Sequence, residues 1–209
     1  MTLTRFLTLR GPARMTRAAS LLLVAGAAAT VAGCSSTVRE GQSPAYLVLR
    51  SLQATSGQGD GGQFTTVLRS DVMTEGSVFE DNGKVELSLA MRDITNPTGP
   101  TANNLVTLNR YRVTFRRTDG RNTPGEDVPY AFEGAIGVTV GDGATEAVFS
   151  LVRAQAKLER PLVTLRCVNG ALVISTIADV TFFGKDQTGR DVTVTGSISV
   201  NFADWADED

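Results

Sequence analysis

Apolar and polar residues alternate with a period of two through much of the chain after residue 45. The stretch 192–202 is the clearest case, because every second residue is apolar or glycine and those between are Thr, Ser or Asn. The same alternation runs through 84–91 and 130–140. Successive side chains of a β-strand point to opposite faces, so this pattern predicts strands with one face on a core and the other in water.

Further strands and turns complete this pattern. Strands are predicted at 45–53, 64–68, 105–117, 145–157 and 172–183, and a short helical turn at 159–166 with Pro161 at its first position. Asn82 and Gly83 form a two-residue hairpin signal, and the clusters at 141–143 and 186–189 are typical of turns. About eight antiparallel strands without a long amphipathic helix predict an all-β fold, an immunoglobulin-like β-sandwich, with a closed barrel as the alternative.

The N-terminal region follows a different pattern. An uncharged apolar run of 16 residues, 18–33, comes directly after Arg14 and Arg17, and no acidic residue precedes Glu40. A helix of that length spans roughly 24 Å, whereas a bilayer core is about 30 Å thick. The run is therefore short for a transmembrane helix, but it fits the apolar region of a signal peptide behind a positive N-terminus. Cleavage after the alanines at 27–29 is one possible site.

The four residues 31–34, Val-Ala-Gly-Cys, resemble the lipobox of bacterial lipoproteins. The resemblance implies cleavage between Gly33 and Cys34 and a diacylglycerol on the Cys34 sulfur, so that membrane lipid is the first expected partner. It divides the chain into a signal peptide, 1–33, a lipidated cysteine with a flexible tether, 34–44, and the β-sandwich domain, 45–209. Ser35 after the cysteine resembles the pattern for sorting to the outer membrane, which places the protein in the cell envelope, at the outer rather than the inner membrane.

The net charge and the cysteine content limit the classes of partner and the means of stabilising the domain. Without residues 1–33 the chain keeps 16 basic and 22 acidic residues, a net charge of −6. This balance argues against nucleic acid as a partner and against a general attraction to anionic membranes. The only other cysteine, Cys167, would then have no disulfide partner, and between Thr-Leu-Arg at 164–166 and Val168 we expect a buried, inert thiol. The domain must therefore be stabilised by its core.

The chain has no histidine. This absence excludes catalysis by Ser-His-Asp or Cys-His groups, and it excludes the usual zinc sites. We predict no catalytic residue, metal or cofactor. Carboxylate chemistry remains as an alternative, since the pairs Glu80-Asp81 and Glu126-Asp127 lie in predicted turns. A periplasmic glycan-acting enzyme would use Glu126 or Asp127. The same acids, with others in turns, could bind calcium through oxygen ligands, but no calcium-loop spacing is present.

Three arginines, Arg110, Arg112 and Arg116, share one face of the strand predicted at 105–117. One interpretation is a docking strip for an anionic partner, either a polysaccharide or an acidic envelope protein. The other interpretation is a solvated sheet face on which the arginines pair with acids of a neighbouring strand. The sequence leaves both open.

Several short segments resemble a group of uncharacterised bacterial lipoproteins of about this size. They are the residues 34–36, 43–47, 121–125 and 200–204, which read CSS, SPAYL, RNTPG and VNFAD. The resemblance implies no activity. Together with the missing catalytic side chains, it leads us to expect a membrane-anchored, non-catalytic binding or structural module, with an accessory subunit of an envelope complex as the alternative.

Overall fold

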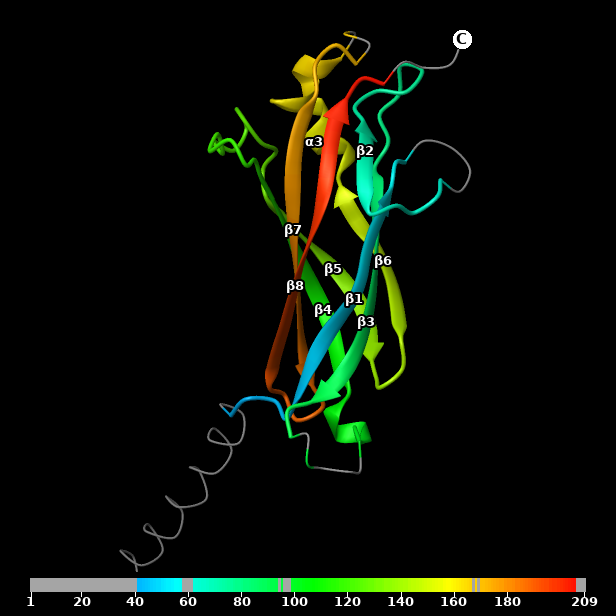
Figure 1. Ribbon diagram of the computed structural model, residues 1–209, viewed down its shortest axis with the longest axis vertical. Coiled ribbons are helices and arrows are strands. Elements are labelled where there is room, and N and C mark those ends of the chain that lie inside the picture. Colours follow the sequence, from blue (N-terminus) through cyan, green and yellow to red (C-terminus); the bar gives the residue numbers. More distant parts are fainter. Residues whose placement is uncertain are drawn as a thin grey trace, which may run out of the picture. The chain divides into compact units, whose positions relative to one another are not determined.

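The computed structural model describes residues 41–57, 62–93, 95, 99–166, 168 and 170–205. The chain divides into two compact units, residues 1–41 and 42–209, and the second contains every strand and helix described (Figure 1). Its eight described strands are β1 (Ala45–Thr55), β2 (Val67–Asp71), β3 (Asp81–Met91), β4 (Val106–Arg116), β5 (Phe132–Val140), β6 (Thr145–Val152), β7 (Ile174–Asp186) and β8 (Asp191–Ala203). The short helices are η1 (Ala102–Asn104), α3 (Ala154–Leu158) and η2 (Leu162–Leu165). The predicted all-β class is confirmed.

The strands form two sheets. The smaller sheet has the order β1-β3-β6 and the larger one the order β2-β8-β7-β4-β5. All neighbours pair antiparallel except β2 and β8, which run parallel. This parallel pair departs from the antiparallel expectation. It arises because the chain leaves the smaller sheet after β1, adds β2 to the edge of the larger sheet, and returns with β3.

The core lies between the inner faces of the two sheets. The alternation predicted for 192–202 is confirmed, since Val192, Ile198, Val200 and Phe202 are buried and the threonines and serines between them are exposed or half-buried. Three aromatic rings meet at the centre. The Phe149 ring lies 5.0 Å from the Tyr111 ring and 5.2 Å from the Phe182 ring, both in edge-to-face geometry. β6 from one sheet and β4 and β7 from the other are thus joined by aromatic packing.

The hairpin predicted at Asn82 and Gly83 is wrong. Both residues lie inside β3, where Gly83 is opposite Ala54 of β1 and Phe149 of β6. A Cβ atom on Gly83 would lie 2.5 Å from the Phe149 ring, so the glycine serves close packing and not a turn. A hairpin turn and close packing against an aromatic ring both favour glycine. The sequence alone therefore does not distinguish the two roles at position 83.

The limits of most predicted strands differ by a few residues from those observed, and two of these differences have a local cause. The strand predicted at 64–68 begins at Val67, because Thr65 forms only an isolated bridge to Ala54 before the chain crosses to the other sheet. The strand predicted at 145–157 ends at Val152 and is followed by α3, whose Ala-Gln-Ala-Lys-Leu sequence has high helix propensity. The helical turn predicted at 159–166 is present as η2, with Pro161 directly before it.

The two predicted turn clusters at 141–143 and 186–189 are confirmed. The first joins β5 to β6 and the second joins β7 to β8. In the second, the Asp186 carboxylate accepts hydrogen bonds from the backbone N–H groups of Thr188 and Arg190, at 2.9 and 3.0 Å. An aspartate that binds the backbone two residues ahead is the usual way in which this residue type stabilises a turn.

Predictions for the N-terminal segment, including cleavage after Gly33 and lipidation of Cys34, lie outside the described residues, as does the prediction for Cys167. The first described residues contact the domain directly. Ser43 is buried, and its carbonyl accepts a hydrogen bond from Arg92 Nε at 3.0 Å, while the Pro44 carbonyl accepts one from the Arg92 backbone N–H at 2.8 Å. No helix in the part of the chain that the structure describes has the length and apolar character needed to cross a membrane.

Candidate functional site

A β-bulge in β4 places the three predicted arginines on the outer face of the larger sheet. The pairing of β4 with β7 shifts by one residue between Leu108 and Arg110, leaving Asn109 as the extra residue relative to β7. Before the bulge the even-numbered residues are buried, and after it the odd-numbered ones are. Arg110, Arg112 and Arg116 are consequently all exposed. A bulge commonly redirects a side chain in this way at functional surfaces.

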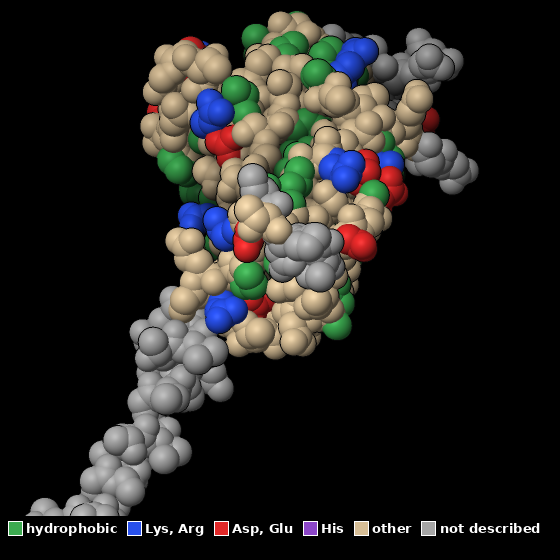
Figure 2. All heavy atoms as spheres, turned by 60° about the horizontal axis from the view of Figure 1, so that its bottom comes forward, with side chains coloured by type: hydrophobic (Ala, Val, Ile, Leu, Met, Phe, Trp, Pro, Cys, Tyr) green, Lys and Arg blue, Asp and Glu red, His purple; other side chains and the backbone are tan. Residues whose placement is uncertain are grey.

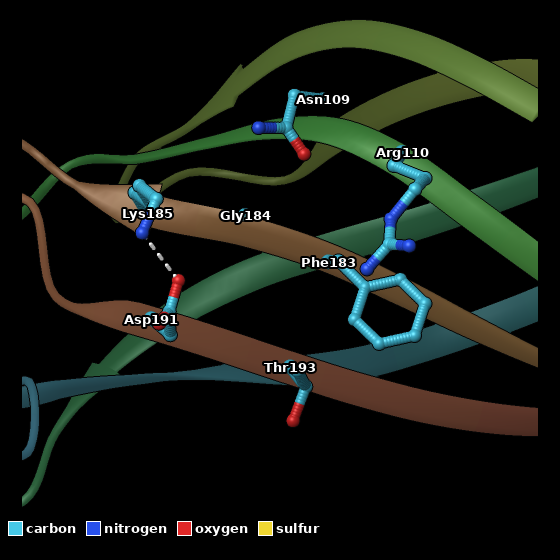
Figure 3. A pocket seen from close by; sticks show the side chains of 7 residues that line it. All are labelled: Asn109, Arg110, Phe183, Gly184, Lys185, Asp191 and Thr193. Carbon is cyan, nitrogen blue, oxygen red and sulfur yellow. Dashed lines mark hydrogen bonds and ion pairs between the residues drawn. The ribbon is translucent and has the colours of Figure 1, made fainter.

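A shallow pocket of about 410 Å³ lies beside this bulge (Figure 3). β4, β7 and β8 each contribute to it, with Asn109, Arg110, Phe183, Gly184, Lys185, Asp191 and Thr193 as its lining residues. The Arg110 guanidinium lies over the Phe183 ring, with its Cζ atom 4.3 Å from the ring centroid. Figure 3 shows Lys185 and Asp191 on the opposite side, joined by an ion pair whose Nζ and Oδ1 atoms are 2.6 Å apart. Both cationic groups therefore point to one shallow depression.

Two of the three arginines pair with acids of neighbouring strands. Arg110 forms an ion pair of 2.9 Å with Glu133 of β5, and Arg116 forms one of 2.7 Å with Asp179 of β7. Among the described residues no ion pair of Arg112 is found. These contacts agree with the interpretation of a solvated, paired sheet face. Because such exposed pairs contribute only about 0–1 kcal/mol, an anionic ligand can replace the acid at little cost.

On the face shown in Figure 2, basic and acidic side chains lie close to one another and do not form a large field of one sign. An anion that binds on this face would therefore be recognised by local geometry and not by long-range attraction.

The carboxylates proposed as catalytic groups have backbone partners in a turn. Asp127 Oδ2 accepts a hydrogen bond from the Thr123 backbone N–H at 3.1 Å, and the Asp127 N–H binds the Thr123 carbonyl at 2.8 Å. A neighbouring pocket of about 660 Å³ is lined by Gly125, Tyr130, Glu159 and Arg160, with neither Glu126 nor Asp127 among them. Within the described residues no group of three His, Cys, Asp or Glu side chains is arranged to hold a metal ion.

Asp81, which was expected in a solvated turn, is fully buried at the start of β3. Its Oδ1 atom lies 2.7 Å from Lys157 Nζ of α3, and the two side chains are 0% and 1% exposed. Burial raises the pKa of Asp81 above its ordinary value, although the charge of Lys157 opposes this shift. The sequence contains no signal for this pair, because its members are 76 positions apart and lysine at 157 follows helix-forming residues.

The comparisons with known proteins add no relative. No protein-family model matches the chain, and no curated protein matches it. The chemistry of the outer sheet face and of the buried pair is therefore the basis for any functional conclusion.

Proposed function

We propose that this protein is a lipid-anchored envelope lipoprotein whose β-domain is a non-catalytic binding module. The proposed ligand is an anionic polysaccharide that docks on the outer face of the larger sheet. The observation that carries this proposal is the pocket at the β4 bulge, where Arg110 is stacked on Phe183 and Lys185, paired with Asp191, lines the opposite side. Cationic side chains next to an aromatic ring and the hydroxyl of Thr193 suit a chain of acidic sugars, which presents carboxylates and hydroxyls together.

The proposed anchor is the diacylglycerol on Cys34, after cleavage at Gly33. Two acyl chains give stable membrane attachment, whereas one gives only marginal binding. The serine at position 35 supports attachment at the outer membrane. We also propose that the two-sheet domain is an immunoglobulin-like sandwich, supported by its count of strands and its aromatic core, with the parallel β2–β8 pair as a departure from that topology.

Binding of a soluble acidic polymer by the purified full chain in detergent tests the ligand class. Polygalacturonate carries a carboxylate on each sugar, and dextran of similar length is the uncharged control. We expect the chain to bind polygalacturonate and not dextran. Arg110→Ala should weaken this binding about ten-fold, corresponding to about 1.4 kcal/mol. Binding should also weaken as salt is added, because the contact is between charges.

Arg121→Ala is the matched control. Arg121 is equally a surface arginine paired with an acid, since its Nη2 lies 2.9 Å from Asp119 Oδ2, but it is not among the residues that line the pocket. We expect this variant to bind as the wild type does. Equal binding of polygalacturonate and dextran, or an equal loss in both arginine variants, would contradict a site at the bulge.

One observation favours the alternative role as an accessory subunit of an envelope complex. Leu158, Leu172 and Val173 are 48%, 55% and 47% exposed. Leu158 is the last residue of α3, and the other two come directly before β7, which begins at the end of the domain opposite the start of β1 (Figure 1). A protein partner could cover these apolar side chains. If so, crosslinking in native membranes followed by purification should yield one defined crosslinked product. Leu172→Asp should abolish that product. If the wild-type chain forms no crosslinked product, this role is contradicted.

A further inference from the structure

The buried pair of Asp81 and Lys157 brings an amine and a carboxyl group into direct contact. Lys157 Nζ lies 2.7 Å from Asp81 Oδ1, and neither side chain is accessible to water. Asp81 is opposite Val152 in the pairing of β3 with β6, and Lys157 follows in α3 directly after β6. The amine and the carboxyl are thus held against each other by the sheet itself, which supplies the proximity that an intermolecular condensation lacks.

Three further donors surround the carboxyl group. The Gly57 backbone N–H donates to Oδ1 at 3.0 Å, and the Ser56 hydroxyl approaches the same oxygen at 3.5 Å. The Ser70 hydroxyl, itself buried, donates to Oδ2 at 2.5 Å. The two carboxylate oxygens therefore have different surroundings. Oδ1 accepts hydrogen bonds from the Lys157 amine and from a backbone N–H, whereas Oδ2 accepts one from a hydroxyl.

We propose that Lys157 and Asp81 form an intramolecular amide bond. Lys157 Nζ passes one proton across its hydrogen bond to Oδ1, which leaves a neutral amine beside a neutral carboxylic acid. Nζ then bonds to the Asp81 Cγ atom, the bond from Cγ to Oδ1 breaks, and a second proton from Nζ leaves with Oδ1 as water. The ammonium and carboxylate thus become one amide and one water molecule, without any oxidant or reductant.

The surroundings favour each part of this step. Negative charge that develops on Oδ2 during the attack is stabilised by the Ser70 hydroxyl, in the manner of an oxyanion hole. Burial disfavours the ion pair, since two charges are costly away from water, whereas an amide carries no net charge. The raised pKa of Asp81 has the same cause and increases the share of the neutral acid, the form that an amine attacks.

The bond would connect the beginning of β3 to α3. It would thus join the strand that pairs with β6 to the helix that follows β6 in the chain. The domain has no disulfide among its described residues, and a covalent link between β3 and α3 would hold the two elements together under mechanical load or in denaturant. A chain fixed at a membrane and bound to a polymer would be exposed to such load.

Tryptic digestion of the full chain purified from membranes tests the bond. Without it, trypsin releases 70–84, 154–157 and 158–166 as separate peptides, with the Arg160–Pro161 bond uncut. With the bond, Lys157 is no longer a cleavage site, and 70–84 appears joined to 154–166, lighter than the two peptides together by one water. We expect the joined peptide in the wild type. A wild-type digest that contains 154–157 in full yield and no joined peptide would overturn the proposal.

Three variants make the result specific. Lys157→Arg keeps the positive charge but replaces the amine by a guanidinium, so the joined peptide should disappear. Asp81→Asn should still form it, with ammonia as the leaving group, and the joined peptide should have the wild-type mass. Ser70→Ala should leave the pair in place and lower the joined fraction, because the hydrogen bond that stabilises charge on Oδ2 is lost. A joined peptide of the same yield in Lys157→Arg would show that another residue is linked.

Discussion

Replacing Gly83 by alanine should destabilise the domain, because the added methyl group would enter the centre of the core. The new Cβ would lie 2.5 Å from Phe149 Cζ and 2.9 Å from both Cε atoms, whereas carbon atoms in contact are ordinarily about 3.5–4.0 Å apart. The Phe149 ring must therefore move by about 1 Å. It has little space to do so, since it is buried and contacts the Tyr111 and Phe182 rings at 5.0 and 5.2 Å.

Overpacking of this kind costs about 1–3 kcal/mol. For a domain of this size, about 2 kcal/mol lowers Tm by about 4–8 °C. Gly137→Ala is the matched control, because Gly137 also lies inside a strand, β5, and a Cβ there would meet no atom within 4 Å. That substitution should be neutral or stabilise the fold by up to about 1 kcal/mol through the unfolded chain.

Urea unfolding followed by circular dichroism measures both variants. We expect a lower midpoint for Gly83→Ala with an unchanged slope, and a midpoint for Gly137→Ala at or above that of the wild type. Adding Phe149→Leu to Gly83→Ala should recover part of the loss, since the smaller side chain leaves room for the methyl group. Equal midpoints for the two glycine variants would refute the explanation of why glycine occupies position 83.

Other substitutions test the core and the charged turns. Phe182→Ala should lower the free energy of unfolding by about 3–5 kcal/mol, since the ring is fully buried, and a loss below about 1 kcal/mol in urea titration would contradict its central place. Burial raises the pKa of Asp186, but hydrogen bonds from Thr188 and from the turn backbone outweigh this, so the net pKa lies below the ordinary value. Its contribution to stability is therefore present above the ordinary pKa of 3.8 and lost as the pH falls through the lower folded value, so Asp186→Asn should reduce the acid dependence of the urea midpoint. A hydrogen bond from Arg117 is the main cause that holds the pKa of Asp119 well below its usual range. NMR titration should therefore find Asp119 still ionised at a pH where an ordinary aspartate is protonated. Arg117→Ala should raise the pKa of Asp119.

The strands with one buried and one exposed face could be predicted from the sequence, because burial imposes a period of two on the residues themselves. β8 is the clearest example, and its predicted range differs from the observed one by a single residue at each end. What could not be predicted is pairing between strands. The parallel position of β2 beside β8 depends on where a five-residue strand finds a free edge, and nothing in its own residues encodes the partner.

The candidate site was only partly accessible from the sequence for a similar reason. The arginines on one strand face follow from their spacing, but the bulge at Asn109 and the stacking on Phe183 depend on the register of β4 with β7. Asp81 beside Glu80 has the same local pattern as a pair of solvated turn acids. Its burial against Lys157 follows from where β3 begins in the sheet, which is a property of the assembled fold.

Attachment to the membrane through Cys34 is tested most directly by metabolic labelling with a radioactive fatty acid. Cells that express the full chain should incorporate label into the wild-type protein, and the label should be absent from Cys34→Ala. The labelled protein should also partition into the detergent phase, whereas the variant should remain in the aqueous phase. Equal labelling of the two proteins, or none in either, would contradict a lipid anchor at Cys34.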